Sequence, residues 1–266
     1  MSIDRTVIQG FQEKIFSWWK NNKREFPWRK TRNPYHILVA EVMLQQTQAS
    51  RVVEKYQHFI TRYPTPSKLA KANTADVLTL WSGLGYNRRA LWLQEAAKQI
   101  VSMEQFPRTL DELQNLKGVG PYTSRAILIF AFNENIATVD TNIRRILIAE
   151  GFADESTSKK ELLKIGQQLV PKGRSRAWHN ALMDYSSLEL TATRTDIRPA
   201  SSQKPFRGSR REYRGRVVKF LTKHKKSPQK TIIAECNIPM SKVEDVFSSL
   251  LNDGLIKKDG NEISLP

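Results

Sequence analysis

Cysteine is nearly absent from this chain, because Cys236 is the only one in 266 residues. A single thiol cannot build a disulfide framework, and it excludes any site that needs several thiolate ligands. We therefore expect a protein of a reducing compartment, namely the cytoplasm, associated with the nucleoid if the source is prokaryotic.

Long apolar runs are also absent. No stretch approaches the ~18 consecutive apolar residues that a bilayer-spanning helix needs, and residues 1–5 do not begin a secretory signal. We expect a soluble monomer with no membrane partner.

Acidic residues are few compared with basic ones: 43 Lys and Arg stand against 26 Asp and Glu, which gives a formal net charge of +17. The excess is spread along the chain, since the part from Lys204 onward carries 14 basic and 7 acidic residues. Such a field favours a polyanion, and nucleic acid is the leading class of partner. The alternative is a basic protein without such a partner.

Alternating strand patterns are scarce in the first 190 residues, where helical periodicity dominates. Two apolar stripes show it: Ile8, Phe11, Ile15, Trp18 and Trp19, and then Val52, Tyr56, Phe59 and Ile60. Prolines fall between such stripes, where they begin or end helices. The pattern predicts a mostly α protein in which residues 1–190 form one compact helical domain.

A polar stretch rich in proline and serine, residues 191–209, is typical of a linker. Beyond it, residues 210–266 contain three short helical patterns, at 211–223, 230–236 and 241–252. A β-hairpin pattern follows at 255–265, with its turn at Asp259-Gly260. This order predicts a small winged-helix-like α+β module, a fold that serves DNA binding and protein docking alike.

Two glycines spaced one residue apart, Gly118 and Gly120, lie in the stretch Leu116–Thr123 between helical segments. Such a hairpin lets backbone N–H groups approach a phosphate closely. The alternative is an ordinary tight turn. Together with Lys117, Val119 and Thr123, the glycines form a candidate DNA-binding hairpin.

Glu41 is the single carboxylate inside the apolar run Pro34–Gln48. Apolar surroundings raise the pKa of a carboxyl, so that it remains an acid near neutral pH. The alternative is a place on the solvent face of its helix. The run ends in four polar side chains, Gln45, Gln46, Thr47 and Gln48. They are candidates for hydrogen bonds to a base edge or a DNA strand. The alternative is that they belong to an ordinary helix surface.

Asp140 precedes a predicted helix that begins at Thr141. Its default interpretation is an N-cap, and a carboxylate at that place is also able to stabilise a developing cation. Asn142 and Arg144 follow it in the same segment and complete the candidate DNA-binding set.

In order and spacing these segments resemble the helix-hairpin-helix (HhH-GPD) DNA glycosylase superfamily, and within it the MutY-type adenine glycosylases. The resemblance runs from about residue 10 to 187 and is carried by 26–29, 34–48, 80–86, 116–123 and 139–145. The string of residues 41–48, Glu-Val-Met-Leu-Gln-Gln-Thr-Gln, separates this branch from the endonuclease III branch.

The resemblance implies a two-lobed helical fold and excision of a base that has left the DNA stack. Glu41 then matches the acid that protonates the purine, and Asp140 the carboxylate that stabilises the oxocarbenium-like sugar. Tyr86 matches a residue wedged into the duplex, while Trp28 and Arg29 match the pocket region. Tyr122 stands where bifunctional relatives carry a Schiff-base lysine, which implies a monofunctional enzyme with little or no lyase activity.

The chain departs from this family in two main respects. Residues 188–205, which follow the Met183-Asp184 helix, lack the four cysteines of the usual iron–sulfur cluster. We therefore expect neither a cofactor nor a metal. Other contacts must then order this segment. The remaining residues do not accommodate the usual NUDIX-like domain that reads 8-oxoguanine. Thr141 and Asn87 are smaller departures.

We expect a base-excision-repair glycosylase that removes adenine mispaired with guanine or 8-oxoguanine from double-stranded DNA. One alternative is a thymine or uracil mismatch glycosylase (G:T, G:U), which Glu41 disfavours because its acid suits a purine. A second alternative is a catalytically inactive DNA-binding protein.

Overall fold

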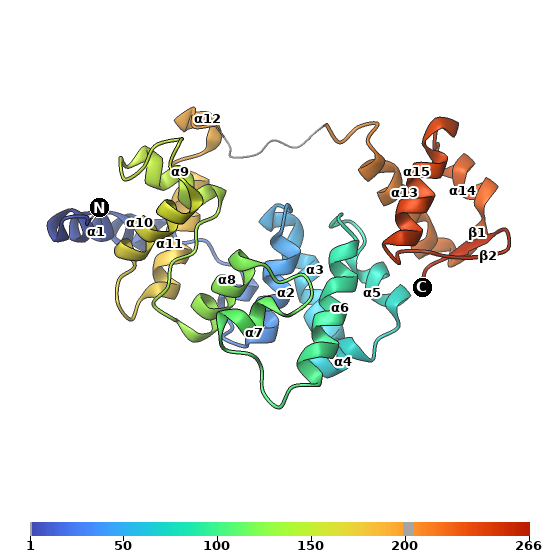
Figure 1. Ribbon diagram of the computed structural model, residues 1–266, viewed down its shortest axis with the longest axis horizontal. Helices are drawn as coiled ribbons and strands as arrows, with labels where there is room; N and C mark the ends of the chain where they lie inside the picture. The colour runs from blue at the N-terminus through green and yellow to red at the C-terminus, as the bar shows by residue number, and fades with distance from the viewer. Residues whose placement is uncertain (1, 199–204) are drawn as a thin grey trace. The chain divides into compact units, whose positions relative to one another are not determined.

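The predicted apolar stripes become helices in the computed structural model, which describes residues 2–198 and 205–266 (Figure 1). The mostly α fold class is confirmed, and one small sheet lies near the C-terminus. Residue contacts divide the chain into two compact units. The first comprises Met1–Leu38, Arg108–Gln114 and Val119–Ser202, and the second Val39–Pro107, Asn115–Gly118 and Gln203–Pro266.

Helices dominate the first unit. Its elements are α1 (Arg5–Asn22), the 3-10 turn η1 (Pro27–Arg29), α7 (Leu110–Gln114), α8 (Pro121–Phe132), α9 (Thr141–Ala149), α10 (Lys159–Leu169), α11 (Ser175–Leu188) and α12 (Ala192–Thr195). Helix α2 (Pro34–Leu44) begins in this unit and ends in the second.

The second unit holds α3 (Ala49–Arg62), α4 (Pro66–Ala70), α5 (Thr74–Trp81), α6 (Arg88–Val101), α13 (Arg210–His224), α14 (Gln229–Glu235) and α15 (Met240–Asn252). Its three short strands are β1 (Lys226–Pro228), β2 (Lys257–Asp259) and β3 (Glu262–Ser264). In the described residues no helix has the length and apolar character that crossing a membrane requires.

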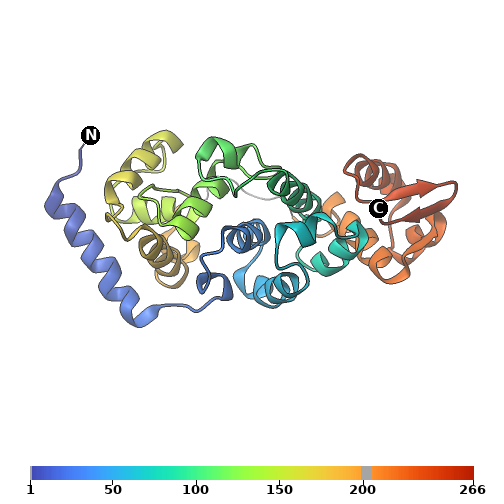
Figure 2. The ribbon, with the colours of Figure 1, turned by 90° about the horizontal axis from the view of Figure 1, so that it is seen from below.

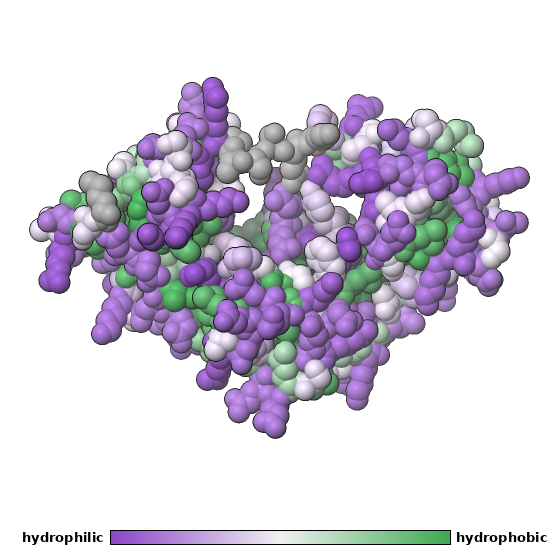
Figure 3. All heavy atoms as spheres, in the orientation of Figure 1, coloured by the Kyte–Doolittle hydropathy of each residue, from purple (hydrophilic) through white to green (hydrophobic). Residues whose placement is uncertain are grey.

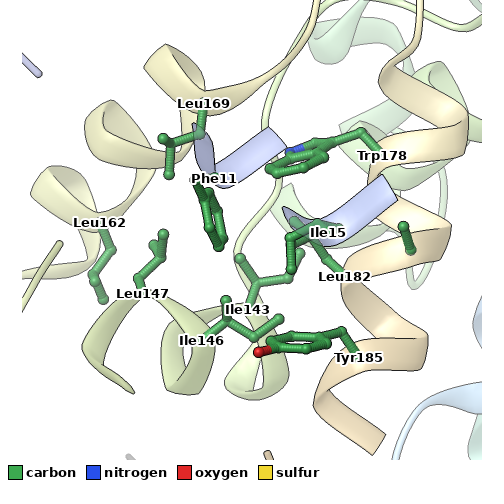
Figure 4. Close-up of a cluster of buried hydrophobic side chains, with 11 residues drawn as sticks. Phe11, Ile15, Ile143, Ile146, Leu147, Leu162, Leu169, Trp178, Leu182 and Tyr185 are labelled. Atoms are coloured by element: carbon green, nitrogen blue, oxygen red, sulfur yellow. The ribbon is translucent and has the colours of Figure 1, made fainter. Parts of the chain in front are cut away.

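Helix α1 buries one face in the core of the first unit (Figure 4). Phe11 and Ile15 lie among side chains of α9, α10 and α11, and the Phe11 ring meets the Trp178 ring edge-on at 5.5 Å. The other members of the predicted stripe, Ile8, Trp18 and Trp19, pack against this cluster from its margin. The 3.6-residue periodicity therefore predicted this face correctly.

A buried histidine joins α11 to the segment that leads into Asp140. The His179 Nδ1 lies 2.8 Å from the Ser175 carbonyl oxygen, and its Nε2 accepts a hydrogen bond from the Thr138 N–H at 3.3 Å. Nε2 can accept only when the ring is neutral. Burial favours the same form, because it lowers the pKa of His179 to about 4. The sequence pattern did not single out this residue.

The second unit depends on one buried cation, Arg89 of α6, which is 4 % exposed. Its guanidinium donates to the carbonyls of Val42, Met43 and Gln45 at the end of α2, and to those of Leu84 and Gly85 after α5. It also donates to the Thr47 hydroxyl at 3.1 Å. Burial lowers the pKa of Arg89 to about 10, so the group remains charged at neutral pH.

The two loops that Arg89 joins each contain a non-glycine residue in the left-handed region, with φ 55° at Gln46 and φ 46° at Tyr86. Such conformations persist where the surroundings enforce them. The hydrogen bonds of Arg89 to both loops supply that enforcement.

Residues 205–266 contain the three predicted helices and the predicted hairpin, formed by β2 and β3 (Figure 2). Strand β1 was not predicted. It is three residues long, ends in proline and pairs antiparallel with β3, giving the sheet order β1-β3-β2. A segment this short shows no alternation that a sequence pattern can detect.

The predicted linker 191–209 is described in part. Ala192–Thr195 forms the short helix α12, and residues 199–204 lie outside the described residues. The domain boundary placed there stays a prediction.

We predict that Arg89→Lys lowers the free energy of unfolding by about 2–4 kcal/mol, because one ammonium cannot reach acceptors in both loops and some buried carbonyls lose their donors. Denaturant unfolding measures this. The matched control is Arg88→Lys, since Arg88 is half exposed and forms a surface ion pair, so we expect a change of at most about 1 kcal/mol. Equal effects of the two substitutions would contradict the assigned role.

We also predict an acid-labile first unit. The unfolded His179 titrates near its usual pKa of about 6.5, and the folded one near about 4, so the unfolded state binds the proton first. Stability from this group is present above pH 6.5 and is lost as the pH falls toward 4, by up to about 3 kcal/mol. His179→Gln, measured by thermal unfolding across this range, has a shallower pH dependence. Parallel profiles would show that another group is responsible.

Candidate active site

Glu41 lies in helix α2, whose start is defined by Asn33 and Pro34. The Asn33 side chain accepts hydrogen bonds from the N–H groups of Tyr35 and His36 at 3.0 and 3.3 Å, and Pro34 occupies the first helical position, where its missing donor has no effect. Glu41 is 7 % exposed between the buried residues Ala40 and Val42. The alternative of a solvent-facing Glu41 is therefore wrong, and the carboxyl is buried as the acid interpretation requires.

Helix α2 ends at Leu44, so the expectation that the helical run continues to Gln48 is wrong. Residues 45–48 form the turn into α3 instead, and Gln48 is the N-cap residue of α3. The Thr47 hydroxyl lies between the carbonyls of Gln45 and Leu84 and accepts from Arg89. Thr47 thus supports the turn, whereas Gln46 and Gln48 are exposed. Their contact with DNA stays a prediction.

Asp140 is the N-cap of α9. Its Oδ1 accepts from the N–H groups of Asn142 and Ile143 at 3.0 and 2.8 Å, and its Oδ2 accepts from the Asn142 side-chain amide at 2.8 Å. Burial raises the pKa of Asp140, and the hydrogen bonds from Ile143 and Asn142 oppose this rise. The capping interpretation is confirmed. The same carboxyl is desolvated, which an ordinary surface cap is not.

Asn142 is itself held by Arg145, whose guanidinium also donates to the Ser186 hydroxyl and the Leu190 carbonyl. Arg144, the candidate phosphate contact, donates to the carbonyls of Arg198 and Glu155 at 3.0 Å each. These two arginines therefore fasten the segment after α11, where the four cysteines are missing. In the described residues, no group of three or more His, Cys, Asp or Glu is placed to bind a metal ion.

The hairpin between α7 and α8 has the expected glycine geometry. Gly118 has φ 79°, and a Cβ there would lie 2.9 Å from the Trp92 Cβ, so both the turn and the close approach require glycine. Gly120 is the N-cap of α8 and offers no side-chain cap. Lys117 is exposed, and its N–H donates to Gln99.

The remaining hairpin residues differ in exposure. Val119 is buried and supports the turn, whereas Tyr122 is half-buried in the first turn of α8. Thr123 is 3 % exposed, so little of its side chain is accessible to a ligand. The sequence could not show this burial.

Trp28 and Arg29 form part of η1 in the first unit. The Trp28 ring stacks on Phe26 at 4.9 Å, and the Arg29 guanidinium makes two hydrogen bonds to Asp184, of 2.7 and 2.9 Å. Burial acts to raise the pKa of Asp184, but hydrogen bonds and charge from Arg29, with help from Trp19 and Arg24, lower it overall. Sequence reasoning missed this network, because its members lie far apart in the chain.

Tyr86 lies between α5 and α6 and is 37 % exposed. The Arg89 guanidinium lies 5.5 Å from the centre of its ring, and Gly85 before it also has a positive φ. The loop therefore presents an aromatic side chain at the surface on a fixed backbone.

Comparisons with known proteins identify the family of this chain. Residues 39–172 match the family described as HhH-GPD superfamily base excision DNA repair protein. An adenine DNA glycosylase of Mycolicibacterium smegmatis is 39% identical over 184 residues, which cover 67% of this chain and 63% of that protein. The adenine DNA glycosylase of Homo sapiens is 36% identical over 76% of this chain and 39% of its own. The chain thus spans less than two thirds of the length of these relatives.

Among solved structures, a thermostable thymine-DNA glycosylase is similar with a TM-score of 0.65 and 29% identity, over 70% of this chain and 88% of that one. The family match covers half of the chain and contains Glu41, the hairpin and Asp140. The chain therefore belongs to the HhH-GPD superfamily of base excision DNA repair proteins.

Proposed function

We propose that this protein is a monofunctional DNA glycosylase that hydrolyses the N-glycosidic bond of adenine mispaired with guanine or 8-oxoguanine in duplex DNA. The observation that carries the proposal is the pair of desolvated carboxyls, Glu41 buried in α2 and Asp140 at the start of α9. The adenine glycosylase relatives support the choice of base, and the net charge of +17 supports a DNA partner.

In this mechanism Glu41 acts as the general acid. It donates its proton to a ring nitrogen of the extruded adenine, and the base leaves with the electron pair of the glycosidic bond. Glu41 is 7 % exposed, so bulk water has little access to the group that would donate this proton.

Asp140 stabilises the positive charge that develops on the sugar. The hydrogen bonds from Asn142 and Ile143 to its carboxylate favour the ionised form and fix its direction. Water then adds to the sugar carbon and releases its proton to a carboxylate, as in glycoside hydrolysis. Tyr122 has no amine, so the sugar forms no imine with it and the DNA strand is not cut by the enzyme.

A thymine or uracil mismatch glycosylase is the second candidate, because the similar solved structure is a thymine-DNA glycosylase. The two functions differ in substrate, not in fold. Duplexes carrying A:8-oxoguanine, A:G, T:G, U:G or hypoxanthine pairs, treated with hot alkali after incubation, separate them. We expect cleavage of the A:8-oxoguanine and A:G duplexes only after alkali. T:G cleavage alone would replace the first proposal, and cleavage of none would favour an inactive DNA-binding protein.

We predict that Glu41→Gln lowers the single-turnover excision rate by about 10²–10⁴-fold, because the amide cannot donate a proton in the transition state. Affinity for the mispaired duplex remains within a few-fold, as the side chain keeps its size. Fluorescence anisotropy and gel assays measure the two quantities. An active Glu41→Gln enzyme would place the acid elsewhere.

We predict that Asp140→Asn lowers the excision rate by about 10²–10³-fold through the loss of negative charge. Asparagine is an equally good N-cap, so thermal stability changes little. Asp140→Ala is the matched variant that loses the cap as well, and it is destabilised by about 1 kcal/mol more. If Asp140→Asn is as unstable as Asp140→Ala and its rate falls only in proportion to the folded fraction, the residue is structural alone.

A further inference from the structure

A contact in the second unit links the C-terminal residues to the Tyr86 loop. Arg211, in the first turn of α13, donates a hydrogen bond to the Tyr86 hydroxyl at 2.6 Å. Its guanidinium also lies 5.4 Å from the centre of the Tyr86 ring. With Arg89 at 5.5 Å from the same ring, two cations from separate parts of the unit hold one exposed aromatic side chain.

An ion-pair group beside this contact anchors α13 and α15 to α6. Asp253, after α15, pairs with Arg88 of α6 at 3.0 Å and with Arg214 of α13. Position 254 is also close to α6, since a Cβ on Gly254 would lie 3.9 Å from Leu91. The Arg211–Tyr86 contact is therefore part of a wider interface within this unit, not a chance meeting of two long side chains.

The other arginines of α13 are engaged differently. Arg210 pairs with Asp245, and Arg216 with Glu212, so both bind carboxylates of residues 205–266 themselves. The surface of α15 carries Glu244 and Asp245, which do not suit a helix that approaches phosphates. Carboxylates therefore occupy Arg210 and Arg216, and Arg211 is distinguished by contacting the Tyr86 loop.

Tyr86 has the features of a side chain that enters a nucleic-acid stack. Its ring is exposed, its backbone is held in the left-handed region, and its neighbours are cations. Aromatic and apolar side chains of this kind insert between or stack on bases, and guanidinium groups beside them meet the phosphates. A tyrosine ring free to rotate would lose conformational entropy on insertion, whereas a ring already held does not.

We propose that Arg211 is a positioning residue for Tyr86, and that through it the C-terminal residues 205–266 set how tightly the enzyme grips the duplex at a base-extrusion site. That duplex DNA is the partner rests on the proposed function. The occupant of the surface around Tyr86 is a duplex from which one nucleotide has left the stack.

A double-mutant cycle tests this on the full chain. The variants are Arg211→Gln, Tyr86→Phe and their combination, and the control is Lys219→Gln, which removes one exposed positive charge from the same helix. The probe is a fluorescein-labelled duplex with a tetrahydrofuran abasic site opposite guanine. It cannot be hydrolysed, so binding is measured independently of excision.

Each single variant removes the same charge-assisted hydrogen bond, so we expect each to weaken binding by about 3–10-fold. The double variant is then no weaker than about the worse single variant, because the second change removes a partner already lost. Lys219→Gln lowers the affinity for the duplex by less than about twofold, and it also lowers the salt dependence of binding. Arg211→Lys keeps the positive charge but loses the planar guanidinium group with its several N–H donors. We expect it to restore only part of the affinity that Arg211→Gln loses.

Multiplicative effects in the double variant, or an Arg211→Gln effect equal to that of Lys219→Gln, would overturn the proposal. Full rescue by Arg211→Lys would also do so, because it would reduce Arg211 to a general charge. Denaturant unfolding of each variant identifies any loss of affinity that follows from unfolding. Tyr86→Phe keeps the ring, so it tests the hydrogen bond even if Arg211→Gln is poorly folded.

The outcome is separable from that of the proposed function. If the protein excises no base but Arg211 and Tyr86 are coupled in the binding assay, the result supports this inference and contradicts the proposed activity. An enzyme that excises adenine but shows independent effects supports the activity and contradicts the inference. Failure of the wild-type protein to bind the abasic duplex contradicts the inference, while the excision assay still decides the proposed activity.

Discussion

The buried guanidinium of Arg89 is the interaction on which the second unit depends. It lies between the end of the helix that carries Glu41 and the loop that carries Tyr86, and it bonds to main-chain carbonyls of both. A buried cation is unfavourable unless its donors are satisfied, and here carbonyl dipoles satisfy them. The α2 terminus and the Tyr86 loop therefore cannot shift independently, so the candidate acid and the exposed aromatic share one support.

A comparable support is present in the first unit, where Asp140 caps α9 and the His179 ring accepts a hydrogen bond from the N–H of Thr138, two residues before Asp140. In both units, hydrogen bonds to the backbone hold a helix end that lies near a candidate functional residue: the end of α2 near Glu41, and the start of α9 at Asp140. Helix ends offer unpaired N–H and C=O groups, so they supply the polar environment that a buried carboxyl or a strained loop needs.

The sequence predicted those features that follow from periodicity or from local chemistry. The buried face of α1, the capping role of Asp140 and the need for glycine at position 118 were all accessible, because each depends on neighbours in the chain. Arg89 was not accessible. An arginine in a helical pattern is assigned to the surface by default, and its acceptors are carbonyls, which every residue possesses and which leave no sequence signature.

The end of α2 illustrates a second limit. Glutamine favours helices, so nothing local predicted that Gln46 would adopt φ 55° and that the helix would stop at Leu44. Long-range bonds from Arg89 outweigh the local preference. The functional roles of Glu41, Asp140, Tyr122 and the glutamines rest on the family resemblance, since burial and geometry show what these groups are able to do without showing a substrate.

The basic residues show that attraction and contact are separate properties of this surface. Hydrophilic side chains cover most of the face drawn in Figure 3, and basic residues outnumber acidic ones, 43 to 26. Arg144 and Arg145 bind neutral carbonyls, which leaves the net charge and hence the long-range attraction for DNA unchanged. Their guanidiniums are nevertheless occupied by hydrogen bonds within the protein, whereas the candidate phosphate contact Lys117 is exposed. Net charge therefore predicts the class of partner, whereas only the hydrogen-bond pattern distinguishes the cations that hold the fold from those positioned to bind.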